Sequence, residues 1–358
     1  MTNTRRRAAL TRRTALQGAT ALATLGLVPQ LVRAQAGAAT QTGSPAQPAA
    51  AAKPVPKGTK LVMLGTRGGP GVDITRSETA CALVVDGVTY LLDCGYGTMR
   101  ALVASGLGFL KVDTMFLTHL HDDHTADIAA LLAHQWTGGK TSPTNIYGPY
   151  ATAATVAGAL QFSHANVEIR TIDEGRTVQP EALFFGHDLT VGAEPTRVFA
   201  DERIVVTAVT NTHYPERAVA RMAHRSFGYR FETATRTIAF SGDTAYSANV
   251  VKLARGADVF VCEIMDHGMY LDNVARAKAA AEAGNTESIA RHVAEAHSPP
   301  AEVGRMAAEA KVKTVVLNHQ LRGPGTPGGG GFQISAFIDG VREKFTGEVI
   351  VGEDQLVI

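Results

Sequence analysis

The order of predicted elements indicates an α/β protein with four layers, in which two sheets pack face to face between two layers of helices (αββα). Strands come first and helices later in each of two halves of the chain, which is typical of sheets covered by helices. No internal repeat is visible. Hydrophobic periodicity predicts strands at 60–65, 79–85, 88–93, 114–117, 145–149, 203–210, 226–231, 236–240, 258–262, 314–317 and 348–351. It predicts helices at 95–105, 126–135, 151–160, 285–296, 301–310 and 334–344, with short strands and loops over 163–200.

A polar cluster rich in histidine occupies residues 118–125, between a short buried strand and an apolar helix. His119 and His121 alternate on an extended segment, so both imidazoles are expected to point the same way. Asp123 and His124 are adjacent in sequence and can provide ligands at a second, neighbouring position. Residues 122–125 are expected to cap the helix that follows. This geometry suits two metal ions side by side. The alternative is a polar helix start with incidental histidines.

Three further candidates follow predicted strands in the second half of the chain. They are His213, Asp243 and His319. The carboxyl ends of strands are where α/β sheets place their functional sites. Each candidate also has a plain structural alternative, as a capping histidine or as a turn residue.

The charge balance argues against binding to a polyanion. The first 36 residues contain six arginines and no acid. Without those six, the 34 basic residues fall to 28 against 33 acidic ones, so the remaining chain is mildly acidic. Bulk attraction to nucleic acid requires the opposite sign, and no nucleic-acid partner is expected.

The N-terminal segment has the features of an export signal. Residues 11–17 (TRRTALQ) resemble a twin-arginine motif, although Ala15 replaces the usual bulky residue. The apolar run at 15–28 is too short for a stable membrane span, and 34–36 fits a signal-peptidase site. An uncleaved membrane anchor is the alternative. The expected organisation is a signal peptide at 1–36, a disordered Ala/Pro-rich linker at 37–57 and a folded domain at 58–358, with periplasmic or secreted localisation.

The three cysteines are expected to be buried small hydrophobic residues. Cys81 and Cys94 flank a hairpin that turns at residues 86–87, and that turn places Cys81 opposite Leu92 rather than Cys94. With Cys262, the count is odd and no C-x-x-C spacing occurs. A disulfide is therefore not predicted.

The motif H-x-H-x-D-H at 119–124 resembles that of the metallo-β-lactamase superfamily. The resemblance implies the αββα fold and a dinuclear metal centre whose bridging hydroxide is the nucleophile. One ion would be held by residues matching His119, His121 and His213. The other would be held by those matching Asp123, His124 and His319, with Asp243 bridging the two. Zinc is the expected metal, with Mn²⁺ or Fe²⁺ as alternatives.

Other short segments resemble the ribonuclease Z branch of that superfamily, which also includes exported arylsulfatase-like and phosphodiesterase-like hydrolases. These segments are 64–66, 226–230, 241–244, 257–258 with Glu263, and 297–298. The resemblance implies that His297 donates a proton to the leaving group and that Glu263 orients it. A helix-end histidine is the alternative. The chain departs from the branch in having no basic arm for tRNA and in the residues after His319.

These observations predict an exported metal-dependent hydrolase of small anionic esters, either phosphodiesters or aryl sulfates. Asp123, His297 and Glu263 are the predicted catalytic residues, and Arg67 and Arg322 are predicted to clamp the anion, unless both are solvated loop residues. A lactonase or β-lactamase-type ring hydrolase is the main alternative. A tRNA endonuclease or a non-catalytic metal-binding protein is less favoured, and a homodimer stays open. The remaining histidines are expected to be surface or packed residues, with His267 closest to the pocket. Residues 268–284 are expected to form a lid or an exposed insertion.

Overall fold

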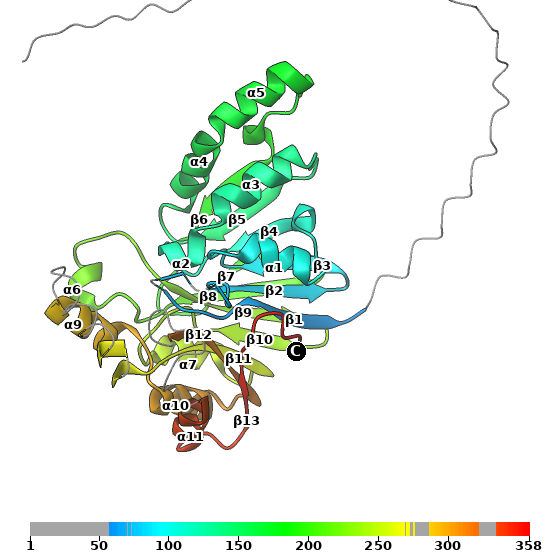
Figure 1. The fold of residues 1–358 in the computed structure, drawn as a ribbon. Coiled ribbons are helices and arrows are strands. Elements are labelled where there is room, and N and C mark those ends of the chain that lie inside the picture. The colour runs from blue at the N-terminus through cyan, green and yellow to red at the C-terminus, as the bar shows by residue number, and fades with distance from the viewer. Residues whose placement is uncertain are drawn as a thin grey trace, which may run out of the picture. The chain divides into compact units, whose positions relative to one another are not determined.

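The fold is described from a computed structural model that covers residues 57–69, 71–72, 74–268, 270–272, 275, 286–321 and 334–358. The predicted signal peptide, almost all of the predicted linker and Arg322 lie outside these residues. Residues 54–358 group into one compact unit. Its strands form two sheets with helices on their outer faces (Figure 1).

The first sheet has six strands in sequence order, β1 to β6. Strands β1, β2 and β3 pair antiparallel, and β3 to β6 pair parallel through helical crossovers. Cys81 pairs with Leu92 in the hairpin, as predicted, and all three cysteines are free and buried. The strands are β1 (Thr59–Gly65), β2 (Ala80–Val85), β3 (Val88–Leu92), β4 (Val112–Phe116), β5 (Thr144–Gly148) and β6 (Phe184–Asp188).

The second sheet has seven strands in the order β13-β12-β11-β10-β9-β8-β7. Its β7 to β10 part is antiparallel, and its β10 to β13 part is parallel. The strands are β7 (Thr196–Ala200), β8 (Ile204–Thr210), β9 (Phe227–Thr233), β10 (Thr237–Phe240), β11 (Val259–Met265), β12 (Thr314–Leu321) and β13 (Glu348–Val351).

Three buried apolar clusters confirm the four-layer arrangement. The middle one lies between the sheets, where Phe116 of the first sheet packs on Tyr229 and Phe231 of the second. Successive side chains of a strand point to opposite faces, so the same strands also bury residues against helices. The outer face of the first sheet packs on α1 (Thr98–Ala104), α3 (Ile128–Thr137) and α4 (Thr152–Phe162). The outer face of the second packs on α7 (Ala248–Ala254), α10 (Pro300–Ala310) and α11 (Ile334–Arg342).

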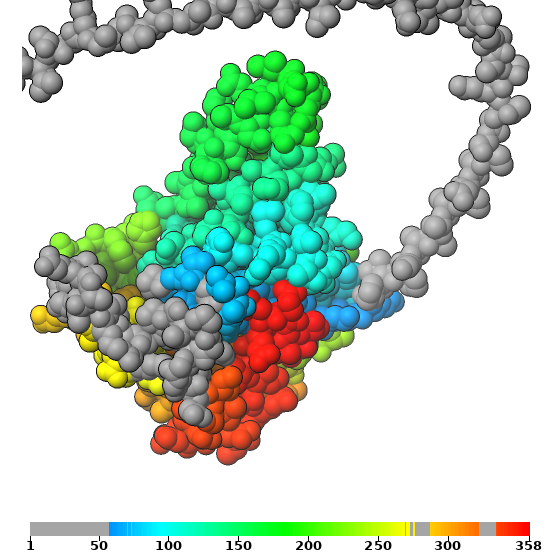
Figure 2. Space-filling view, viewed as in Figure 1, coloured from blue at the N-terminus to red at the C-terminus, as the bar shows by residue number. Residues whose placement is uncertain are grey.

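Residues 163–200 differ from the prediction of short strands and loops. They begin with a helix, α5 (His164–Glu174), and only then form β6 and β7. The helix has no buried residue and projects beyond α4, which itself packs on the first sheet (Figures 1 and 2). It was not predicted because the β-branched Val167, Ile169 and Ile172 lower its helix propensity. Ser163 and Gly175, which flank the helix, are typical helix-end residues that could have indicated it. Helix α7 was likewise missed.

Two local predictions near the histidine cluster were also wrong. Residues 122–125 do not cap the next helix; they form their own one-turn helix, α2 (Asp122–Thr125), and α3 starts at Ile128. Strand β12 continues to Leu321, so His319 lies within the strand and not beyond its end. A register shift against β11 and a φ of 45° at His319 mark an irregularity at this point, which redirects the side chain.

The other helices are short or frame the site. They are α6 (Glu216–Val219), α9 (Thr286–Ala296) and the 3₁₀ turns η1 (Phe109–Lys111) and η2 (Pro180–Ala182). Within the described ranges, the longest apolar helices fall short of the length needed to cross a bilayer.

Candidate metal centre

Candidate ligands from both sheets meet at one edge of the sandwich. The first sheet contributes the segment that follows β4, which runs through His119 and His121 into α2. The second sheet contributes residues that follow β8 and β10 and one residue within β12. All seven predicted ligands fall into two neighbouring groups that could each hold a metal ion.

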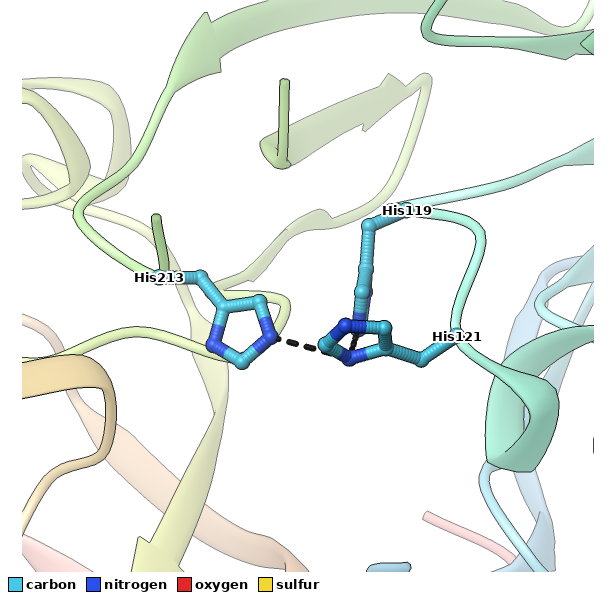
Figure 3. A group of neighbouring side chains, drawn as sticks. All are labelled: His119, His121 and His213. Atoms are coloured by element: carbon cyan, nitrogen blue, oxygen red, sulfur yellow. Dashed lines mark hydrogen bonds between the residues drawn. The ribbon is translucent and has the colours of Figure 1, made fainter. Parts of the chain in front are cut away.

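One group, the three-histidine cluster, consists of His119, His121 and His213 (Figure 3). Nε2 of His119 lies 3.0 Å from Nδ1 of His121, and Nε2 of His213 lies 3.2 Å from the same nitrogen. Three ring nitrogens thus converge on one point. Neutral imidazole is a preferred ligand of zinc and other transition metals, so this donor set fits a divalent ion.

The opposite ring nitrogens of two of these histidines are held by neighbours. Nδ1 of His119 lies 3.1 Å from Oγ1 of Thr118, and Nδ1 of His213 donates to the carbonyl oxygen of Ala296 at 3.1 Å. Such contacts fix the ring and leave Nε2 directed into the cluster. Burial, the largest cause, lowers the pKa of both His119 and His213, so both rings stay neutral and keep a lone pair for a metal.

The other group, the aspartate–histidine cluster, is entirely buried. Oδ2 of Asp243 lies 3.0 Å from Nε2 of His319, and its Oδ1 lies 3.3 Å from Nε2 of His124. Asp123 approaches His319 to 3.1 Å. Within the described part of the chain, Nε2 of His124 is buried with no hydrogen-bond partner, an arrangement that a bound cation would explain. The members are Asp123, His124, Asp243 and His319.

Asp243 lies between the two clusters. Its Oδ2 is 3.8 Å from Nε2 of His119, besides its contacts to the aspartate–histidine cluster. A carboxylate has two oxygens and can neutralise two cations. This geometry agrees with the bridging position that the sequence implied.

The protonation state of the second cluster is set by its carboxylates. Burial alone would lower the pKa of His124 and His319, but the negative charges outweigh it. Asp243 and Asp123 raise the pKa of His319 to about 10. The pKa of His124 is raised by Asp243, Asp123 and Asp93. The same ion pairs lower the pKa of Asp123 and Asp243 despite burial.

Asp93, at the end of β3, supports this cluster and was not predicted. Nδ1 of His124 donates to Oδ2 of Asp93 at 2.9 Å, and Asp93 also accepts from the backbone N and Oγ1 of Thr118. Its φ is 58°, a left-handed conformation that is uncommon outside glycine. Backbone strain of this kind concentrates at functional sites. The sequence signal was only a lone aspartate after a buried strand.

His297 and Glu263, the predicted proton donor and its orienting carboxylate, are in contact. Nδ1 of His297 lies 3.0 Å from Oε2 of Glu263, and Oε1 of Glu263 accepts from the backbone N of Thr244. The His297 ring stacks parallel to His319 with centroids 5.7 Å apart and lies 5.1 Å from His213. Burial raises the pKa of Glu263. Because the His297 ring contacts both His319 and His213, the His297–Glu263 pair borders both clusters.

The loop after β1, which contains the predicted clamp residue Arg67, approaches the centre closely through two glycines. A Cβ at Gly68 would meet the His319 ring at 2.6 Å, and a Cβ at Gly69 would meet the Asp123 carboxylate at 2.5 Å. These glycines thus let the backbone approach the protein's own candidate ligands, and the N–H of Gly69 donates to Asp123 at 2.6 Å. Nε of Arg67 donates to the carbonyl oxygen of Gly71 in the same loop.

Three further side chains near the centre were not predicted to be functional. Tyr214 lies beside His213, with ring centroids 4.9 Å apart. His292 of α9 lies 5.3 Å from His297, and burial and the charge of His297 lower its pKa to about 4. His267 donates from Nε2 to the carbonyl oxygen of His297 at 3.1 Å, so it lies near the pocket as expected. Most of the predicted lid, 268–284, is outside the described residues.

Two clusters of candidate metal ligands at the edge of an αββα sandwich are typical of metallo-β-lactamase-fold hydrolases. Residues 88–320 match the family described as the β-lactamase superfamily domain, and the chain belongs to that family.

Similar proteins point in the same direction. A protein named ribonuclease Z from Mycobacterium sp. (strain KMS) is 28% identical over 264 residues, which is 73% of this chain and 84% of that protein. The metallo-β-lactamase fold protein YhfI from Bacillus subtilis superposes with a TM-score of 0.59 at 18% identity, over 84% of this chain and 98% of that one. Human tRNase Z, short form (ELAC1), gives a TM-score of 0.57 at 23% identity with the same coverage.

Proposed function

We propose that this protein is an exported, dinuclear metal-dependent hydrolase of small anionic esters, with phosphodiesters as the first substrate class and aryl sulfates as the second. The observation that carries the proposal is Asp243, whose carboxylate contacts both the three-histidine and the aspartate–histidine cluster. A shared carboxylate is the arrangement that a pair of cations requires.

The donor set supports zinc. Five histidines and two aspartates supply nitrogen and oxygen ligands, which zinc accepts in a compact geometry, and Mn²⁺ or Fe²⁺ is the alternative. When bound, two divalent ions would supply Lewis acidity and activate a water molecule near neutral pH. The protein would fix the ligand rings of that centre by hydrogen bonds. Asp93 holds His124. Thr118 holds His119, and the carbonyl oxygen of Ala296 holds His213.

The leaving group would be protonated by His297. With its Nδ1–H donated to Glu263, the Nε2 of this ring is the nitrogen that can hand a proton to an ester oxygen. Glu263 would keep the ring in one orientation. No serine or cysteine nucleophile is needed in this scheme, which agrees with three cysteines that are all buried.

The relatives named ribonuclease Z make RNA the competing substrate. We favour a small molecule, because the described residues form no basic arm. The projecting helix α5 carries Glu168, Asp173 and Glu174, and Arg170 is paired with Glu174. Such a surface would repel a polyanion.

The substrate panel that tests this proposal uses one zinc-loaded preparation. Turnover would be measured on bis-p-nitrophenyl phosphate, p-nitrophenyl sulfate, nitrocefin, an acyl-homoserine lactone and a precursor tRNA. We expect the phosphodiester to be hydrolysed fastest and activity to disappear after chelation of the metal. Faster turnover of the lactone or of nitrocefin would establish the ring-hydrolase alternative, and faster cleavage of the tRNA would establish a nuclease.

Export by the twin-arginine route is part of the proposal and rests on residues 11–36. Replacing Arg12 and Arg13 by Lys is expected to leave the precursor in the cytoplasm, as judged by fractionation and immunoblotting. The matched control replaces Arg5 and Arg6, which lie outside the motif. Unaltered export of the Arg12/Arg13 variant would reject the route.

A further inference from the structure

The ring of Tyr214 lies against all three histidines of the three-histidine cluster. Its ring centroid lies 4.9 Å from that of His213, 5.7 Å from that of His121 and 6.2 Å from that of His119. The side chain is only half-buried, so its outer part remains accessible. No other tyrosine of the described residues has its ring packed on the candidate ligands.

The hydroxyl of Tyr214 has no hydrogen-bond partner within the described part of the chain. Three other tyrosines have a hydrogen-bond acceptor for their hydroxyl group. Tyr90 donates to Asp201 at 2.5 Å, Tyr229 to the carbonyl oxygen of Leu117 at 2.9 Å and Tyr246 to Glu309 at 2.6 Å. A tyrosine that is packed into a protein usually finds such a partner. The hydroxyl of Tyr214, whose ring lies against the candidate ligands, is therefore available to an acceptor that the described residues do not supply.

Most ring nitrogens beside Tyr214 are already engaged. Nδ1 of His119 and Nδ1 of His213 contact Thr118 and Ala296, and Nε2 of both rings converges with Nδ1 of His121. Protonated phenol is a hydrogen-bond donor at neutral pH, because an ordinary tyrosine titrates near ~10. A donor left open beside a candidate metal position is suited to an anionic oxygen of a bound substrate.

We propose that the hydroxyl of Tyr214 donates a hydrogen bond to a non-bridging oxygen of the anionic ester, on the three-histidine side of the centre, and is a catalytic residue of the hydrolysis. The proposal rests on the function proposed above. Phosphoryl transfer spreads negative charge over the equatorial oxygens in the transition state, and a fixed donor aimed at one of them stabilises that charge.

The decisive variant is Tyr214→Phe, which removes one oxygen and keeps the ring packed on the histidines. For bis-p-nitrophenyl phosphate we expect kcat to fall by about 10- to 300-fold, as for loss of one oxyanion donor, with KM changed by less than about threefold. Zinc content and the melting temperature are expected to stay at the wild-type values. The control is Tyr150→Phe, at an exposed tyrosine away from the centre.

A binding measurement separates this inference from the identity of the substrate. Calorimetric titration of the zinc-loaded protein with inorganic phosphate is expected to give a Kd about 5- to 20-fold weaker for Tyr214→Phe than for the wild type and for Tyr150→Phe. Equal phosphate affinity in all three proteins, or an unchanged kcat in Tyr214→Phe, would overturn the role of Tyr214.

The phosphate titration still tests the role of Tyr214 even if the wild type hydrolyses no phosphodiester. That result would refute the proposed substrate, while a weaker phosphate Kd in Tyr214→Phe would still support the hydrogen bond. If the variant does not fold, the near-ultraviolet difference spectrum of the wild type serves instead. Phosphate is expected to perturb a tyrosine band, and a flat difference spectrum at saturating phosphate would overturn the proposal.

Discussion

The two clusters of the candidate metal centre use the same residue type in opposite electrostatic environments. Among the described residues, no carboxylate is hydrogen-bonded to a histidine of the three-histidine cluster, and burial lowers the pKa of His119 and His213. In the aspartate–histidine cluster, carboxylates raise the pKa of His124 and His319 above the usual value. One cluster is therefore neutral and ready for a metal ion, while the other holds protons that a metal ion must displace.

The two electrostatic environments meet two different requirements of a dinuclear metal site. A neutral set of imidazoles binds a cation without competition from protons, whereas a set with fixed carboxylates offers more negative charge but binds protons in the absence of metal. The clusters share only Asp243. The two ions are thus expected to bind with different pH dependence and to depend on one another through one side chain.

The largest effect is expected from removing that shared side chain. Asp243→Ala takes a carboxylate from both clusters, so the second ion and nearly all activity should be lost, by about 10³-fold or more. Elemental analysis and turnover of the chromogenic phosphodiester measure both. Asp173→Ala, at an exposed position on α5, is the control for loss of one negative charge. Two ions per chain in Asp243→Ala would contradict the shared position.

A substitution at His297 is expected to affect chemistry and to leave both clusters filled. His297→Gln should lower kcat by about 10²- to 10⁴-fold for an ester with a poor leaving group, because such an oxygen needs a proton. The loss should be much smaller for p-nitrophenolate, and Glu263→Gln should show the same pattern to a lesser degree. The control is the exposed His164→Gln. Equal losses for both leaving groups would exclude proton donation.

The pH dependence of metal binding tests the comparison directly. His319 has a pKa of about 10 in the metal-free protein, against 6.5 ordinarily, so zinc must displace its proton at neutral pH. Affinity at the aspartate–histidine cluster should therefore rise about tenfold per pH unit for each proton displaced, from pH ~7 to ~9. Affinity at the three-histidine cluster should be flat above pH ~6.5. Zinc titration by calorimetry in two buffers of different ionisation enthalpy counts the protons released.

The same raised pKa also affects the stability of the metal-free protein. Because the folded-state pKa of His319 lies above 6.5, its stabilising ion pairs are fully formed below that pH and are lost as the pH rises through about 10. The melting temperature of the metal-free protein should fall over this range, and zinc-loaded protein should change less. A melting temperature that rises with pH would contradict the ion pairing.

The smallest effect is expected from the predicted anion clamp. Its Arg322 is close in sequence to His319, a member of the aspartate–histidine cluster. Arg322 follows His319 by three residues. Arg322→Ala should cost about 1.5–3 kcal/mol of transition-state stabilisation toward an anionic ester and far less toward a neutral phosphotriester. The control is Arg342→Ala in α11. Equal losses on both substrates would contradict the predicted clamp and favour the hypothesis of a ring hydrolase.

Most of the centre was predictable because its ligands leave local signals. His119, His121, Asp123 and His124 are close in sequence, so strand and turn geometry alone brings them together. His213 and Asp243 follow apolar strands, which places them at a sheet edge. The layers were predictable for the same reason, since buried strands and amphipathic helices each leave a periodic pattern.

The parts that were missed depend on contacts distant in sequence. Asp93 supports His124 only because β3 and β4 are neighbours in the sheet. His292 joins the centre through packing of α9 against His213. The role of Gly68 and Gly69 likewise follows from the approach of one loop to His319 and Asp123. None of these contacts can be derived from residue order or periodicity.

Assembling the centre from both sheets gives it a mechanical consequence. His119, His121, Asp123 and His124 belong to the first sheet, whereas the other three candidate ligands belong to the second. Ions bound at this boundary would fasten one sheet to the other, and neither half could hold them alone. Zinc at 100 times its Kd would stabilise the folded protein by about 2.7 kcal/mol. Removal of zinc by a chelator is therefore expected to weaken the contact between the two sheets at this edge, while the buried cluster between them remains.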